Sequence, residues 1–168
     1  MLSSKGDLFG PSLMEARTAL FSGLGVSKSA VHCPCCDQHV QQYRRRLYKG
    51  LAEMLVWMCR TYSPETGWID VPRQAPPGMV RGGDYAKLEW WGLIKHKVHD
   101  NDPARKDSGL WIPSELGLEF CFHTWRRIQS HVLIYNNELR GFAGEPINII
   151  EALGGDGFHY QRLMAGEW

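Results

Sequence analysis

The feature that most constrains the fold of this chain is a short helix followed by two strands around a charged loop. The helix is predicted from about Gly83 to Trp91, and Gly92 is a typical stop because glycine adopts the left-handed conformation without strain. Strand-like pieces follow at Leu93–Val98 and Leu110–Ile112, and the polar stretch His99–Gly109 separates them. This succession predicts an α+β fold that contains a small β-hairpin.

A longer helix is predicted upstream, from about Gln38 to Thr61. Its apolar residues recur at steps of three and four and so share one stripe; they are Val40, Tyr43, Leu47, Leu51, Met54, Leu55 and Met58. Ser63-Pro64 ends this helix, because the residue before a proline avoids the helical conformation. A shorter helix is predicted over Ser12–Phe21, where Gly23 and Gly25 stop it.

The connector Ser63–Gly83 is rich in Pro and Gly, which makes a helix hard to form there. We expect an extended segment with one edge strand within Gly67–Pro72. After the two predicted strands, Pro113-Ser114-Glu115 opens another helix, with Ser114 as its cap.

The C-terminal part predicts a hairpin and a last helix. The strands are Val132–Tyr135 and Glu138–Phe142, and Asn136-Asn137 forms the turn because asparagine tolerates positive φ angles. The last helix is predicted over Pro146–Leu153, with proline at its start.

Length and charge limit the classes of protein that fit. A chain of 168 residues can bury a core in one domain, and its net charge of +1 requires any nucleic-acid contact to come from a local basic patch. No long apolar run predicts a membrane span, and Met1–Gly10 lacks the apolar core of a signal peptide. We therefore expect a cytoplasmic protein.

Three of the five cysteines lie together in Cys33-Pro34-Cys35-Cys36. Cys33 and Cys36 have the spacing with which two thiolates bind one Zn²⁺ from a tight turn, and His39 is the predicted third ligand. The remaining ligands would come from His32, Cys35, Cys121, His123 or His131. The alternatives are a tight turn with reduced thiols and, with less support, a redox dithiol. Cys59 and Cys121 are predicted to be buried thiols.

The stretch Asp84-Tyr85-Ala86-Lys87-Leu88-Glu89-Trp90-Trp91-Gly92-Leu93-Ile94-Lys95 resembles the MarR family of winged-helix regulators. In that family a helix ends in a Leu-Glu-x-x-Gly-Leu-Ile phrase and leads into the wing. The charged stretch Asp102–Lys106 resembles the wing tip, and Trp111–Gly117 resembles the returning strand and the start of the next helix. The resemblance, over about Gly83 to Phe120, implies a winged-helix-like fold, helix-rich with a small β wing and an additional C-terminal hairpin. The Cys-Pro-Cys-Cys segment at residues 33–36, called here the knuckle, is followed by Tyr43–Leu47, and together they also resemble small phage-encoded proteins.

With this fold we expect a leader and short helix in residues 1–30 and a single winged-helix-like domain in residues 31–168, including the knuckle. The resemblance implies DNA binding and transcription regulation. The predicted nucleic-acid contacts are Arg44, Arg45, Arg46, Lys49, Lys95, Lys97, Arg105 and Lys106, to which Arg126 and Arg127 could add. Asp84 and Glu89 on the predicted recognition helix would repel phosphate. The alternative is that the basic cluster is an ordinary solvated helix face.

Trp90 and Trp91 point to a second possibility. Neighbours on a helix lie about 100° apart, so both indoles cannot face inward, and one of them is expected to meet another segment or another molecule. Trp90 and Trp91 are therefore the predicted protein-contact residues of a partner interface or homodimer. An inhibitor or adaptor without nucleic-acid binding is the alternative function. No catalytic motif such as a P-loop or G-x-S-x-G occurs, so no enzyme is predicted.

Overall fold

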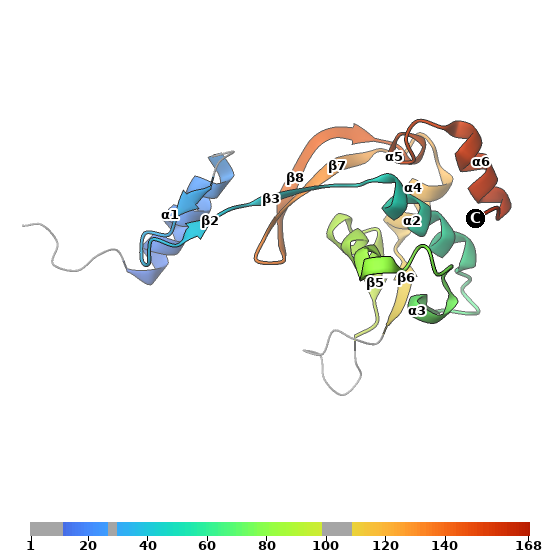
Figure 1. The fold of residues 1–168 in the computed structure, drawn as a ribbon, viewed down its shortest axis with the longest axis horizontal. Coiled ribbons are helices and arrows are strands. Elements are labelled where there is room, and N and C mark those ends of the chain that lie inside the picture. The colour runs from blue at the N-terminus through green and yellow to red at the C-terminus, as the bar shows by residue number, and fades with distance from the viewer. Residues whose placement is uncertain (1–11, 27–29, 99–108) are drawn as a thin grey trace, which may run out of the picture.

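The computed structural model describes residues 12–26, 30–98 and 109–168, in which short helices alternate with strands (Figure 1). In chain order the elements are α1 (Leu13–Val26), β1 (Val31–His32), β2 (His39–Val40), β3 (Tyr43–Arg46), α2 (Lys49–Thr61), β4 (Ile69–Asp70), α3 (Val71–Gln74), the 3-10 helix η1 (Arg81–Trp91), β5 (Ile94–His96), β6 (Leu110–Pro113), α4 (Glu115–Phe122), β7 (Ile128–Tyr135), β8 (Glu138–Ile147), α5 (Ile149–Ala152) and α6 (Gly157–Ala165).

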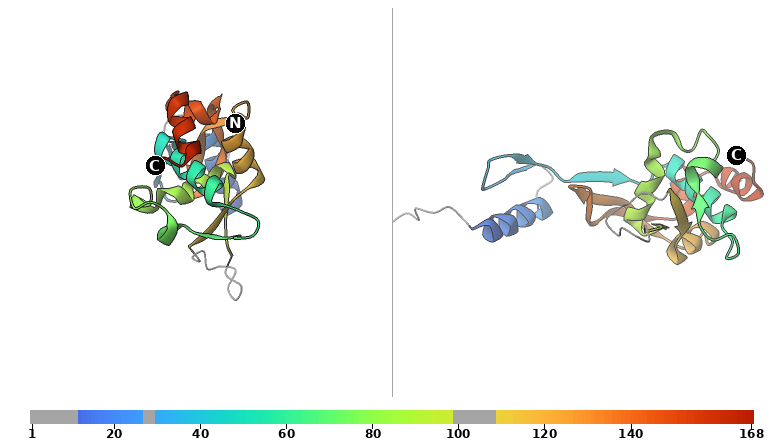
Figure 2. Two further views of the ribbon diagram at one scale, coloured as in Figure 1. Left: turned by 90° about the vertical axis from the view of Figure 1, so that its right-hand side faces the viewer. Right: turned by 90° about the horizontal axis from the view of Figure 1, so that it is seen from below.

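The described strands form three small antiparallel sheets, so the predicted α+β class is confirmed. β1 and β2 form a hairpin, and the two larger sheets have the strand orders β3-β7-β8 and β4-β6-β5. Helix α2 lies among η1, α4, α5, α6 and β6 in the body of the molecule. The β3-β7-β8 sheet extends from this body toward α1 and the β1–β2 hairpin, which lie together at the opposite end from α6 (Figures 1 and 2).

Helix α2 forms the centre of the core because apolar residues cover most of its circumference. The buried ones are Leu51, Ala52, Met54, Leu55, Val56, Trp57, Met58 and Cys59. Lys49, Glu53 and Arg60 form a narrow polar stripe, and the wide apolar face of α2 needs the partners that the surrounding elements provide. Cys121 of α4 is also fully buried, which confirms the prediction for it and for Cys59.

The predicted start of the long helix at Gln38 is wrong, because strands β2 and β3 precede α2. All four residues of β3 pair with β7, from Tyr43 opposite Ile134 to Arg46 opposite His131. The buried Leu47 follows and donates its amide to the Ser130 carbonyl at 2.8 Å. Pairing with a strand distant in sequence therefore overrides a local helical pattern.

Helix α1 is longer than predicted and continues through Gly23. Gly23 packs against the hairpin, where a Cβ would lie at ordinary contact distance, 3.4 Å, from a methyl group of Val31. Phe21 of α1 meets the ring of Tyr135 edge-on, and the Arg140 guanidinium lies 4.5 Å from the Phe21 ring centre. These contacts join α1 to the tip of β7–β8.

The β4-β6-β5 sheet contains the two strands predicted at 93–98 and 110–112, and β4 is the predicted edge strand. Gly92 ends η1 with φ 70° in the left-handed region, as expected. The connector differs from prediction, because Val71–Gln74 forms the short helix α3. Pro72 is tolerated there because it lies in the first turn, where its missing N–H leaves no hydrogen bond unmade.

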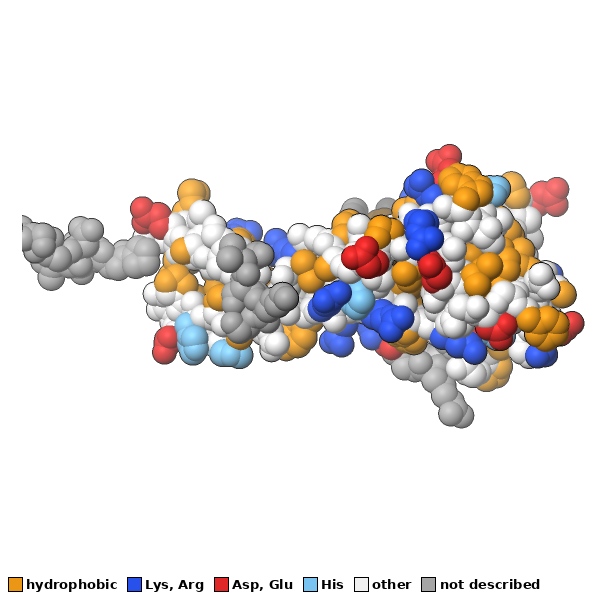
Figure 3. Space-filling view, turned by 90° about the horizontal axis from the view of Figure 1, so that it is seen from above, with side chains coloured by type: hydrophobic (Ala, Val, Ile, Leu, Met, Phe, Trp, Pro, Cys, Tyr) orange, Lys and Arg blue, Asp and Glu red, His pale blue; other side chains and the backbone are white. Residues whose placement is uncertain are grey.

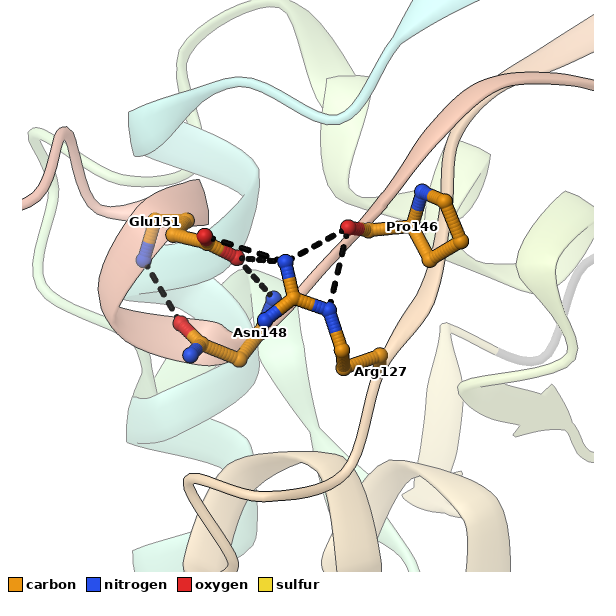
Figure 4. A network of polar contacts seen from close by, with 4 residues as sticks. All are labelled: Arg127, Pro146, Asn148 and Glu151. Atoms are coloured by element: carbon orange, nitrogen blue, oxygen red, sulfur yellow. Dashed lines mark hydrogen bonds and ion pairs between the residues drawn. The ribbon is translucent and has the colours of Figure 1, made fainter.

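The β7–β8 hairpin has its predicted turn, with φ 49° at Asn136 and 60° at Asn137. The helix predicted over Pro146–Leu153 does not begin at Pro146, which belongs to β8; α5 begins at Ile149 after an Asn148 cap, and α6 follows it. Figure 4 shows how this corner is held. The Arg127 guanidinium donates to the Pro146 carbonyl at 2.8 Å and to both Glu151 carboxylate oxygens at 3.0 and 2.8 Å, while Glu151 accepts from the Asn148 amide at 2.8 Å. The base of the hairpin is thus fixed to α5.

Candidate nucleic-acid interface

Strand β3 carries three consecutive arginines, Arg44, Arg45 and Arg46, at the edge of its sheet, and all three are exposed. Side chains alternate between the faces of a strand. Arg45 pairs with Val132 on one face, whereas Arg46 pairs with His131 on the other face, which Arg44 shares. The predicted cluster is therefore exposed as expected, although it lies on a strand instead of a helix.

No carboxylate of the described residues lies within 4.0 Å of these three guanidinium groups. Five arginines elsewhere are paired with carboxylates: Arg73 with Asp70, Arg126 with Glu119, Arg127 with Glu151, Arg140 with Glu138 and Arg162 with Glu167. Arg44, Arg45 and Arg46 differ from these five arginines, because their guanidinium groups can bind an anion from solution.

The three arginines line a groove at the junction of β3 and η1, called here the β3–η1 groove. Its volume is about 250 Å³, and its other lining residues are Tyr48, Leu51, Asp84, Lys87 and Trp91. Lys87 adds a fourth cation from η1. A concave surface lined by several cations concentrates positive potential where an anion would lie.

Asp84 is the acidic residue of this groove, and its charge is already engaged. Its carboxylate accepts from Lys87 Nζ at 2.5 Å and from the Tyr48 hydroxyl at 2.8 Å. Hydrogen bonds from Lys87 and then Tyr48 lower the pKa of Asp84, while burial and the bond to Asp84 raise the pKa of Tyr48 to about 12. Glu89 is likewise paired, with His96. The negative charge of Asp84 is thus partly compensated by Lys87.

Arg44 and Arg46, which share one face of β3, also lie beside His131 of β7. Arg44 Nη2 lies 3.5 Å from His131 Nδ1, and the Ser130 hydroxyl lies 2.9 Å from the same nitrogen. Burial, followed by the charges of Arg44 and Arg46, lowers the pKa of His131. Figure 3 shows that Lys, Arg and His side chains gather in the middle of the face seen there.

Gly144 of β8 covers this cluster at close range. Its φ is +80°, and a Cβ there would overlap with the Ser130 hydroxyl and come within 2.6 Å of His131 Nδ1. The register of β7 and β8 is irregular between Gln129 and His131, opposite this glycine. The arrangement of His131 and Arg44 therefore depends on a glycine at position 144.

The other predicted cations are not among the residues that line the groove. Lys49 begins α2 and lies 3.9 Å from the Glu53 carboxylate, and Lys95 is exposed on β5. Lys97 follows β5 and is half-buried. Arg105 and Lys106 lie outside the described residues. Arg126 and Arg127 form the ion pairs given above and do not line the groove.

Of the two predicted contact residues, only Trp90 retains accessible surface. Trp91 is 4% exposed and donates its indole N–H to the Gln129 carbonyl at 2.8 Å, so it is a core residue. Trp90 lines a cleft of about 550 Å³ between η1, strands β5 and β6, and the hairpin tip. Trp111, Asn137 and Leu139 line the same cleft, so the hairpin lies beside the exposed side of η1.

The predicted metal ligands lie in the β1–β2 hairpin at the far end of the molecule. The Cys33 amide donates to the Gln38 carbonyl at 2.9 Å, and the Asp37 amide donates to the Cys33 carbonyl at 2.8 Å. The backbone amides of Cys35 and Cys36 point at the Cys33 sulfur and lower the pKa of this thiol. His39 pairs with His32 across the hairpin, and their ring centres are 5.5 Å apart. In the described parts of the chain, no three His, Cys, Asp or Glu side chains are grouped to hold a metal ion.

Two residues of the site, Lys87 and His131, have no place in the predicted interface. Lys87 lies three residues after Asp84, a spacing that indicates an ion pair within a helix. No local signal connects His131 with Arg44, because the two are 87 residues apart in sequence. Their proximity follows only from the pairing of β3 with β7.

In comparisons with known proteins, no family model, no curated protein and no solved structure matched the chain. Within residues 12–26, 30–98 and 109–168, no helix has both the length and the apolar character needed to cross a membrane. Function is therefore inferred from the side chains of the site.

Proposed function

We propose that this chain is a winged-helix DNA-binding protein that holds the phosphate backbone with β3 and the β3–η1 groove. The observation that carries the proposal is the set of three adjacent exposed arginines, Arg44 to Arg46, without a carboxylate of the described residues within 4.0 Å and with Lys87 in the same groove. Guanidinium groups bind phosphate oxygens through paired N–H donors, which makes arginine well suited to this contact.

The order of elements supports the winged-helix assignment. Helix α2, strand β4, helices α3 and η1, and strands β5 and β6 follow one another, and the strands form the sheet order β4-β6-β5. This is the order of helices and strands in a winged-helix domain, with η1 in the place of the recognition helix and β5 and β6 in the place of the wing strands. The resemblance to MarR regulators favours a regulatory role.

Contact with the backbone is better supported than reading of bases. Asn137 and Leu139 of the hairpin share a cleft with Lys87 and Trp90, so the hairpin flanks the side of η1 that would enter a DNA groove. In our proposal Arg44, Arg45, Arg46 and Lys87 contact phosphates, while Lys95 and Lys97 of the wing contact the adjacent backbone. Such contacts fix position and supply affinity without selecting a sequence.

The test is a fluorescence-anisotropy titration of labelled random-sequence duplex DNA at low salt. The triple variant R44A/R45A/R46A should bind at least about 100-fold more weakly, since several phosphate contacts are lost together. The matched control is R73A/R126A/R162A, which removes the same charge from arginines outside the groove and should retain binding within a few fold.

Equal weakening in both variants would show that net charge, rather than the β3–η1 groove, governs binding. Binding by neither variant nor wild type would overturn the proposal. Circular dichroism and thermal unfolding of each variant verify that the body is folded.

The cleft beside Trp90 favours one other function, a protein-interaction module. Trp90, Trp111 and Leu139 give this cleft of about 550 Å³ an apolar part, and aromatic side chains are common at the centres of interfaces. This candidate predicts a protein partner that is captured by the wild type and lost with W90A, without effect from the triple arginine variant.

A further inference from the structure

Two cavities of the molecule adjoin at one ion pair of η1. The β3–η1 groove and the cleft beside Trp90, of about 250 and 550 Å³, share the lining residues Asp84 and Lys87. To this pair the groove adds the arginines of β3, whereas the cleft adds aromatic and apolar side chains. A ligand that passes Lys87 therefore meets cations in one cavity and aromatic surface in the other.

The aromatic part of the cleft comes from η1 and the β5–β6 strand pair. Trp90 of η1 lines the cleft and is half-buried. Trp111 of β6 is contacted edge-on by Tyr85, with 5.9 Å between ring centres, and by His96, with 5.6 Å. His96 is itself paired with the Glu89 carboxylate. The fold thus holds Trp111 and His96 in place before a ligand binds, which lowers the entropic cost of binding.

The tip of the β7–β8 hairpin adds one amide and one apolar side chain to the cleft. Asn137 lies in the hairpin turn with φ 60°, and Leu139 of β8 is 40% exposed. A carboxamide both donates and accepts hydrogen bonds, and the edges of nucleobases do the same. The flat faces of bases stack on aromatic rings irrespective of sequence. The cleft therefore combines the groups that bind a base outside a duplex, in a volume typical of ligand sites.

We propose that an unpaired base of a DNA strand binds in the cleft beside Trp90, while the adjacent phosphates bind the arginines of the β3–η1 groove. A nucleotide carries its base and its phosphate on one sugar, and the two cavities meet at one residue, Lys87. The adjoining arginines favour this occupant over an apolar protein segment, which carries no charge to pair with them. The inference rests on the proposed function and adds to it a preference for DNA with a single-stranded end over an uninterrupted duplex.

The experiment measures binding of the full chain to three labelled DNAs by fluorescence anisotropy. The first is a blunt duplex, and the second is the same duplex with a short single-stranded extension. The third has an extension of equal length made of abasic residues, so that the two extensions carry equal phosphate charge and differ only in the bases. We expect the second DNA to bind about tenfold more tightly than the third, which is within the range for stacking of one base on an aromatic side chain.

Three variants locate the base. W90A should abolish the tenfold difference between the two extensions. N137G, in which glycine keeps the positive φ of the turn, should reduce this difference severalfold. The matched control is W125A, which removes an indole that is 69% exposed outside the cleft and should leave the difference unchanged. Each ratio compares two DNAs on one variant, so a general loss of affinity does not alter it.

The outcomes separate this inference from the proposed function. Equal affinity of the unaltered chain for the two extensions, with the blunt duplex still bound, would overturn the inference alone and favour a protein segment in the cleft. A difference that persists in W90A would place the base elsewhere and also overturn it. A base-dependent gain that W90A abolishes, without binding of the blunt duplex, would overturn the proposed duplex binding alone. No binding of any of the three DNAs would overturn both.

Discussion

Arg46 pairs directly with His131 across β3 and β7, and Arg44 approaches the same imidazole from the neighbouring position of β3. Burial and these two charges hold the pKa of His131 below its ordinary value, so the free protein carries a neutral imidazole near neutral pH. An anion bound beside Arg44 and Arg46 would offset their charges and so raise the pKa of His131.

DNA binding is expected to strengthen as the pH falls. Phosphates near Arg44 and Arg46 offset the charges that lower the pKa of His131, so this pKa rises in the complex. Below the raised pKa the complex takes up a proton that the free protein does not hold, and affinity increases. Titrations at about pH 5.5 and about pH 7.5 measure this. H131N should show a smaller dependence on pH, and an unchanged dependence would contradict the account.

Asp84→Asn is expected to tighten DNA binding. The substitution removes a negative charge from the β3–η1 groove and releases Lys87, whose Nζ lies 2.5 Å from the Asp84 carboxylate. Removal of one charge about 6 Å from a phosphate in water is worth about a threefold change in affinity. Asp70→Asn removes the same charge beside Arg73 and should leave affinity unchanged. Weaker binding by the Asp84 variant would indicate that this carboxylate positions the groove.

Gly144→Ala is expected to destabilise the fold more than a matched glycine substitution. Both Gly144 and Gly155 have positive φ, at +80° and +83°, but only at Gly144 would a Cβ meet other atoms. The left-handed conformation costs an alanine about 1 kcal/mol at either site, and the overlap with Ser130 and His131 adds to this at Gly144. Urea unfolding measures both variants. Equal losses would mean that β8 moves freely away from His131.

The corner shown in Figure 4 is expected to weaken in acid. A hydrogen bond from the Asn148 amide, and then one from Arg127, lowers the pKa of Glu151. A carboxylate with a lowered pKa stabilises the fold above its unfolded pKa, and this contribution is lost as pH falls through the folded pKa. The melting temperature of E151Q should therefore depend less on acid pH than that of wild type. Glu65→Gln, at an exposed position outside this corner, should reproduce the wild-type curve.

The local turns and caps could be predicted from the sequence because each depends on a few adjacent residues. Gly92 ends η1, Asn136 and Asn137 form the hairpin turn, and the Ser114 side chain accepts from the Gly117 amide at the start of α4. Each of these follows from a backbone preference that neighbouring residues do not change.

Strand β3 could not be predicted in this way. Val40, Tyr43 and Leu47 recur at helical spacing, and only pairing with β7, close to ninety positions away, selects the strand. The arginines of the site were therefore identified, but their partners Lys87 and His131 were not, because these come from other elements.

The dependence of DNA affinity on salt tests the central claim most directly. The slope of log affinity against log salt concentration changes by about 0.9 for each phosphate contact on duplex DNA. We predict that R44A, R45A, R46A and K87A each reduce the magnitude of this slope by about 0.9, and that R73A leaves it unchanged. A wild-type slope that these four substitutions do not alter would contradict the assignment of the β3–η1 groove to the phosphate backbone.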